Sequence, residues 1–252
     1  MPIRPAALFR PLLAAALALS ASLAQASTGF YGYAYDLENG KYLYTEVHQP
    51  VIEGGKTVAS TIRYHAPDGT ELGKKTLDYR ADPFIPKFRY DLPGEGYAEA
   101  ITANGEVIEV LKISGKGKEK RKSIRREGLM AADSGFHHAI QANLPKLLKG
   151  ETVSFRFIVA GQLDSYRFKV SKVGDASFEG KPAVKLLVQA DSLLRYVAPD
   201  LNLLYDPVSQ RLLEYKGVSN IHDPATGKAY NARIVYFSQP PADAPKTLPP
   251  LR

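Results

Sequence analysis

The sequence predicts a mainly β protein, in which a strongly curved antiparallel sheet forms a half-barrel or open barrel and one short helix near residues 133–149 covers it. Apolar and polar side chains alternate along most segments, which is the pattern of strands with one buried face. Turn signals such as Asn39-Gly40 and Asp68-Gly69 recur at short intervals and suit tight hairpins. Strand follows strand without intervening helices, which argues against a parallel α/β fold.

The first 26 residues have the features of a signal peptide. Arg4 and Arg10 precede or flank an apolar stretch, residues 12–24, and small residues precede an expected cleavage near Ala26. The apolar stretch is too short for a stable membrane span, and no later segment approaches its length. We therefore expect a periplasmic or secreted protein without a transmembrane span, whose residues 27–238 form one β-rich domain.

The first expected strand places Tyr31, Tyr33 and Tyr35 on one face, because alternate side chains of a strand point the same way. A tyrosine-lined face can bind a sugar or a lipid, since each ring combines apolar area with a polar tip. Ordinary cross-strand aromatic packing in a half-buried sheet explains the same pattern without a ligand and is the favoured reading.

A basic run extends from Lys116 to Arg126, in a chain with 33 basic and 26 acidic residues. The run can meet an anionic surface, or it can keep an exposed hairpin soluble and block pairing at a sheet edge. No aromatic residue interleaves it, so it does not support a base-stacking surface, and export argues against intracellular nucleic acid as a partner.

The segment Ser134–Leu148 carries the one clear helical pattern. Asp133 or Ser134 is the expected N-cap and Gly150 the expected stop. Pro145 removes one helical hydrogen bond and predicts a bend or break near Asn143. The apolar face of this helix consists of Phe136, Ile140, Leu144 and Leu147.

The strands after the helix are expected to receive it. Alternation places Phe155, Phe157 and Phe168 toward a core, where they can pack beneath the helix. Residues 185–190 and 233–238 are apolar on consecutive positions, so both faces of these strands need cover. Ser192–Pro199 is a second, weaker helical candidate, and the proline-rich segment 239–252 is expected to be extended and largely free.

The sequence offers no convincing catalytic or metal site and no sign of a cofactor. There is no cysteine, which excludes a thiol nucleophile. His137 and His138 are adjacent, whereas two zinc ligands on one helix face stand four residues apart, so solvated side chains are the simpler explanation. Ser219 lacks the second glycine of a nucleophile elbow, and a local Asp133–His137 pair is explained equally well by capping.

The C-terminal half resembles uncharacterised secreted β-rich proteins of Gram-negative bacteria, a domain of unknown function. The similarity rests on the stretch "DSGFHHAIQANLPKLLKGETVSFRF", residues 133–157, and on a later L-x-Y-x-G-x-S-N-I segment formed by Leu213, Tyr215, Gly217, Ser219, Asn220 and Ile221. More distantly, the expected architecture is similar to the LolA and LolB half-barrels, which the resemblance links to carriage of acyl chains. It implies no catalytic residue.

The first hypothesis is therefore an exported, non-enzymatic binding or carrier protein for an apolar or amphipathic, lipid-like envelope molecule. A hydrolase acting on an envelope polymer and a structural or assembly factor with a protein partner are the alternatives. A contiguous apolar cavity favours the first, and convergent carboxylates or a Ser-His contact in an open cleft favour the second. A filled core together with a flat exposed apolar patch favours the third. The candidate ligand-binding residues are Tyr31, Tyr33, Tyr35, Phe136, Ile140, Leu144, Phe155, Phe157 and Phe168.

Overall fold

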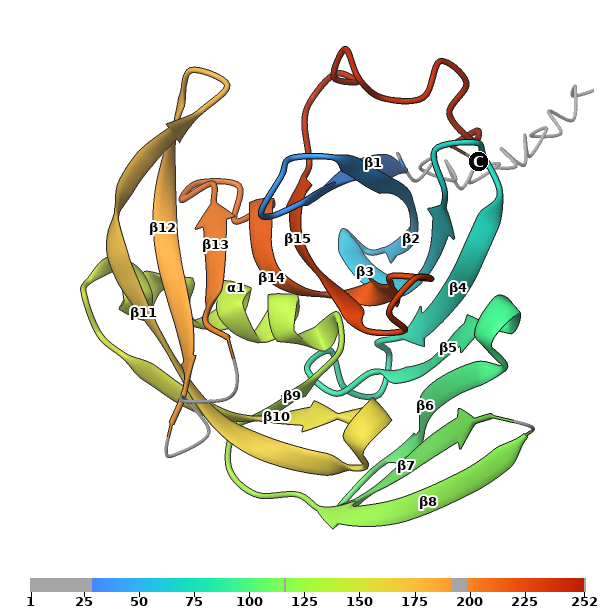
Figure 1. Ribbon diagram of the computed structural model, residues 1–252. Helices are drawn as coiled ribbons and strands as arrows, with labels where there is room; N and C mark the ends of the chain where they lie inside the picture. The colour runs from blue at the N-terminus through green and yellow to red at the C-terminus, as the bar shows by residue number, and fades with distance from the viewer. Residues whose placement is uncertain (1–28, 116, 192–198, 252) are drawn as a thin grey trace, which may run out of the picture.

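The computed structural model describes residues 29–115, 117–191 and 199–251, and these form a mainly β structure with one α-helix in the described residues (Figure 1). The strands before the helix are β1 (Phe30–Asp36), β2 (Tyr42–Glu53), β3 (Lys56–His65), β4 (Glu71–Asp78), β5 (Lys87–Leu92), β6 (Tyr97–Asn104), β7 (Val107–Ser114), β8 (Lys118–Arg125) and β9 (Met130–Ala132). After them come α1 (Gly135–Leu148), β10 (Val153–Val159), β11 (Asp164–Phe178), β12 (Lys181–Ala190), β13 (Leu201–Tyr205), β14 (Leu212–His222) and β15 (Ala229–Val235). Two 3-10 turns are η1 (Pro93–Glu95) and η2 (Ala160–Gln162).

All of these strands belong to one sheet, in the order β8-β7-β6-β5-β4-β3-β2-β1-β15-β14-β13-β12-β11-β10-β9. Consecutive strands from β1 to β8 pair as antiparallel hairpins, as the recurrent turn signals predicted. Strand β9 pairs with β10 in parallel. The first and last strands, β1 and β15, pair with each other in the middle of the sheet. The sheet curves strongly without closing, which confirms the predicted fold class (Figure 1).

The curved sheet surrounds two main apolar cores. One lies within β1–β8 and β14–β15 and is rich in tyrosine, including Tyr44, Tyr64 and Tyr90. The other lies between α1 and β10–β13, with α1 inside the curve of the sheet (Figure 1). The helix therefore covers the sheet as predicted, and β12 buries Val184, Leu186 and Val188 beneath it. The other face of β12 is only partly covered, contrary to expectation, because Lys185 is exposed and Leu187 is half-buried.

Two details of α1 differ from the sequence-based expectation. The helix continues through Pro145 without a break, because the fully buried Leu144 and Leu147 anchor the chain on both sides of the proline. Ser134 is the N-cap but makes no capping hydrogen bond through its side chain, and Asp133 does not cap the helix either. At the other end Gly150 has φ of 86°, which agrees with the expected stop.

The C-terminal segment also differs from expectation. Residues 239–251 form no strand or helix, yet they lie against β1 and β15 instead of extending free. Their cover, together with the tyrosine-rich core on the opposite face, explains why residues 233–238 are apolar on both sides. The helical candidate at Ser192–Pro199 falls on residues 192–198, outside the described residues.

Candidate functional site

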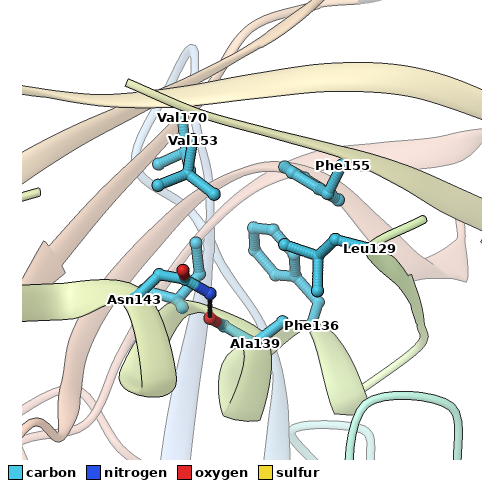
Figure 2. Close-up of a pocket in the computed structure, with 8 residues that line it drawn as sticks. Leu129, Phe136, Ala139, Asn143, Val153, Phe155 and Val170 are labelled. Carbon is cyan, nitrogen blue, oxygen red and sulfur yellow. Dashed lines mark hydrogen bonds between the residues drawn. The ribbon is translucent and has the colours of Figure 1, made fainter. Parts of the chain in front are cut away.

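The predicted residues form two separate clusters. Phe136, Ile140 and Leu144 of α1 pack against the sheet in one cluster, and the tyrosines of β1 belong to another, with the C-terminal tail. In the first cluster the ring centroid of Phe136 lies 5.4 Å from that of Phe155 (Figure 2). It lies 5.8 Å from the ring centroid of Phe157. Phe168 stacks on Phe155 at 6.0 Å, so all three sheet phenylalanines contribute to this layer.

The layer beneath α1 is almost completely filled. Its residual cavity measures about 10 Å³ and is lined by Leu129, Phe136, Ala139, Ile140, Asn143, Val153, Phe155 and Val170 (Figure 2). This volume is about that needed for one water molecule. Ile140 is 2% exposed and Leu144 is fully buried, so an acyl chain has no preformed space here.

The second cluster is the tyrosine face, which we define as the surface formed by Tyr31, Tyr33 and Tyr35 of β1 together with Val235 and Phe237. Tyr33 is 1% exposed and Tyr35 is 7% exposed. Residues of the C-terminal tail cover this face, and Ala244 and Leu248 of the tail pack against Tyr33, Tyr35 and Val235. The expected face thus exists, and a segment of the same chain occupies it.

An open cleft of about 350 Å³ lies at the end of the tyrosine face, where the tail leaves β15. Its lining residues are Tyr35, Asp36, Leu37, Gly40, Arg233, Phe237, Pro241 and Asp243. Such a volume is at the lower end of the range for small-molecule sites. Rings and a proline supply apolar surface, and two carboxylates with one guanidinium supply polar groups.

The polar groups of the cleft are partly committed to one another. The Tyr35 hydroxyl donates to Oδ1 of Asp243 at 3.0 Å, and Nε of Arg233 donates to Glu214 at 2.6 Å. Burial, followed by the Asp243 carboxylate, raises the pKa of Tyr35, while burial beside Tyr42 and Tyr31 raises the pKa of Tyr33 to about 12. Both phenols therefore remain protonated donors near neutral pH.

The paired histidines are not solvated, contrary to expectation. His137 Nδ1 lies 2.9 Å from the hydroxyl of the buried Tyr205, and His138 packs at 4.7 Å against the ring of Tyr79. Burial, with the neighbouring His138 adding to it, lowers the pKa of His137 to about 3. The Asp133 carboxylate accepts a hydrogen bond from Lys75 instead of contacting His137, so the local Asp133–His137 pair does not form.

Sequence reasoning missed a buried ion pair between β4 and the start of α1. Nζ of Lys75 lies 2.5 Å from Oδ2 of Asp133 and 5.0 Å from the ring centroid of Tyr90. Asp133 has φ of 47° and also accepts hydrogen bonds from the backbone and hydroxyl of Ser134. The sequence did carry a sign of this pair, because Lys75 and Leu77 are two positions apart and therefore share the inward face of β4.

Ser219 and the basic run have structural explanations. Ser219 is 7% exposed, and its hydroxyl hydrogen-bonds to Tyr44 and to the backbone of Ile221. The basic run forms β8, an edge strand of the sheet whose side chains are exposed except for Ile124. Lys122 of this strand pairs with Asp164, while position 116 lies outside the described residues.

Across residues 29–115, 117–191 and 199–251, no three His, Cys, Asp or Glu side chains are placed to hold a metal ion. Nor does this part of the chain contain a helix long and apolar enough to cross a membrane.

Comparisons with known proteins leave the family open. No protein-family model matches the chain, and no curated protein matches it either. Among solved structures it is similar to a β-barrel-like protein of domain of unknown function DUF1849 from Brucella abortus, with 7% identity and a TM-score of 0.49. That comparison covers 84% of this chain and 99% of the other. The neighbour is of the expected kind, an uncharacterised β-rich protein, but this similarity is too low to carry a function, and the LolA and LolB likeness is not confirmed.

Proposed function

We propose that the protein is an exported, non-enzymatic binding protein for an amphipathic, lipid-like molecule, which it holds in the cleft at the end of the tyrosine face. The observation that carries the proposal is the open volume of about 350 Å³ beside Tyr35, Phe237 and Pro241. By comparison, the layer under α1 leaves about 10 Å³, so a ligand there requires the helix to move. The cleft is thus the better of the two candidate sites.

The charges around the cleft favour a particular kind of polar group. Asp36 and Asp243 contribute two carboxylates to its lining, while the guanidinium of Arg233 is paired with Glu214. A ligand group that donates hydrogen bonds, such as a hydroxyl or an ammonium, complements these carboxylates, whereas an anionic group is repelled. The apolar part of the molecule packs on the rings of Tyr35 and Phe237.

Calorimetric titration with two short-chain amphiphiles tests this proposal. Octyl glucoside, below its critical micelle concentration, should bind, and octanoate should bind at least about tenfold more weakly, a difference of about 1.4 kcal/mol. Phe237→Ala should weaken octyl glucoside binding by a similar factor. The matched variant Phe157→Ala alters the layer under α1 and should leave binding unchanged; the reverse pattern would place the site beneath the helix.

A second candidate role is attachment to an anionic surface through residues Lys116–Arg126. Its support is the exposure of β8, whose sequence KEKRKSIR carries a strong positive charge at a sheet edge. Co-sedimentation with vesicles containing anionic lipid should then fall steeply as salt rises from 0.05 to 0.5 M. Lys120→Glu should reduce it, and equal binding to neutral vesicles would contradict this role.

A further inference from the structure

The tail and the tyrosine face meet through specific polar contacts as well as through apolar packing. The Tyr31 hydroxyl donates to the backbone carbonyl of Pro249 at 2.5 Å, and Tyr35 donates to the side chain of Asp243 at 3.0 Å. Between these two anchors, Ala244 and Leu248 pack on the rings. The face therefore recognises three features of the segment: an acidic residue, small or branched apolar side chains, and a carbonyl at a proline.

The tail is attached in a way that permits exchange. Within residues 239–251 the backbone hydrogen bond from Ala244 to Pro241 is internal, and none joins this stretch to a strand. The segment contains five prolines, whose fixed φ angles lower the entropy lost when it binds. A segment that makes no backbone hydrogen bond to a strand and is held by side-chain contacts can leave its site without disrupting the sheet.

We propose that the tyrosine face is a recognition site for proline-rich segments of a partner protein, and that the chain's own tail occupies this site in cis. The partner segment carries an acidic residue about six positions before a proline, as Asp243 stands before Pro249. Aromatic surfaces with hydrogen-bond donors are suited to such segments. This inference does not depend on the identity of any molecule in the neighbouring cleft.

The tail competes with any partner, because its attachment gives it an effective local concentration in the millimolar range. Binding in trans should therefore be weak until the tail is loosened. The full-length mature chain carrying Asp243→Ala and Leu248→Ser provides that state, since both changes lie in the tail and leave the tyrosine face intact. The probe is a fluorescein-labelled synthetic peptide with the sequence of residues 239–252, followed by fluorescence anisotropy.

The loosened variant should bind the peptide at least tenfold more tightly than the wild type. Adding Tyr31→Phe or Tyr35→Phe should weaken binding about three- to tenfold, the usual effect of one lost hydrogen bond. Tyr166→Phe is the matched control, because Tyr166 lies on β11, which does not border β1 or β15, and it should bind as before.

Three outcomes would overturn the proposal. In the first, the loosened variant keeps the wild-type thermal midpoint but does not bind the peptide at 1 mM. In the second, Tyr31→Phe and Tyr35→Phe leave peptide binding unchanged. In the third, the protein forms a concentration-dependent dimer by exchange of the tail. The last would assign the face to a second copy. Should the double change reduce the thermal midpoint, Leu248→Ser alone is measured instead, and the expected tightening of at least threefold must still appear.

Discussion

The ion pair between Lys75 and Asp133 should be among the most sensitive points of the fold. The two side chains are 2% and 7% exposed, so each charge depends on the other. Lys75→Met keeps most of the side-chain volume but leaves the Asp133 carboxylate with only its Ser134 hydrogen bonds and no ammonium at 2.5 Å. Removing one partner of a buried pair costs about 3–5 kcal/mol. That loss is a large fraction of the roughly 5–15 kcal/mol by which domains are stable.

The reciprocal change is Asp133→Asn. Asparagine is the appropriate replacement because Asp133 has φ of 47°, a conformation that asparagine also tolerates. The double variant Lys75→Met/Asp133→Asn removes both charges together. Its cost should fall short of the sum of the single changes by about 2–3 kcal/mol, the coupling expected of residues in direct contact.

Urea unfolding measures these costs, followed by far-ultraviolet circular dichroism and by tyrosine fluorescence, since the chain has 15 tyrosines and no tryptophan. Arg89→Met is the control, because Arg89 and Asp91 form a pair whose side chains are 50% and 38% exposed. Such a surface pair contributes at most about 1 kcal/mol. A Lys75→Met variant within about 1 kcal/mol of the wild type, or strict additivity in the double variant, would refute the role of the pair in fastening α1 to β4.

Three further changes test other parts of the structure. Phe136→Ala should lower the free energy of unfolding by about 2–3 kcal/mol, below the 3–5 of a fully buried phenylalanine because Phe136 is half-buried; a loss under 1 kcal/mol would show that α1 does not cover the sheet. Stability should fall as the pH decreases from about 6.5 toward 3, by up to about 1.4 kcal/mol per unit, because unfolded His137 binds a proton that the folded state, with its pKa of about 3, excludes. His137→Phe should flatten that slope in urea titrations at pH 7, 5 and 4, and an unchanged slope would count against it. Gly135→Ala places a Cβ beside the Phe84 carbonyl and should cost about 2 kcal/mol by thermal unfolding, whereas Gly94→Ala, with open space around it, should be neutral.

The strands and their faces could be predicted because side-chain alternation is a local property. In β10 the inward positions Phe155 and Phe157 pack toward α1, as the sequence indicated. Ile158, which follows Phe157 on the opposite face, joins the other core, so this end of the strand is covered on both faces. Alternation shows which side chains share a face, but it does not identify the segment that covers that face.

The covering segments could not be predicted, because their partners are distant in the sequence. Tyr31 and Pro249 are 218 positions apart, and Lys75 and Asp133 are 58 apart. Neither contact leaves a local pattern beyond an apolar face or an inward lysine. The helix break that Pro145 led us to expect near Asn143 is absent for a similar reason, since tertiary burial of Leu144 and Leu147 overrides a local preference.

The tail illustrates what composition does and does not predict. A proline-rich segment with few large apolar residues cannot bury enough surface to fold by itself, and composition correctly indicates that it forms no helix or strand. It does not follow that the segment is free, because β1 and β15 present Tyr33 and Val235, which need cover. The segment supplies that cover with two side chains, Ala244 and Leu248, and with two tyrosine hydrogen bonds. Because so few contacts hold the tail, a second segment of the same chemistry can compete for the tyrosine face. The weak attachment of the tail is therefore what makes this face available to a partner.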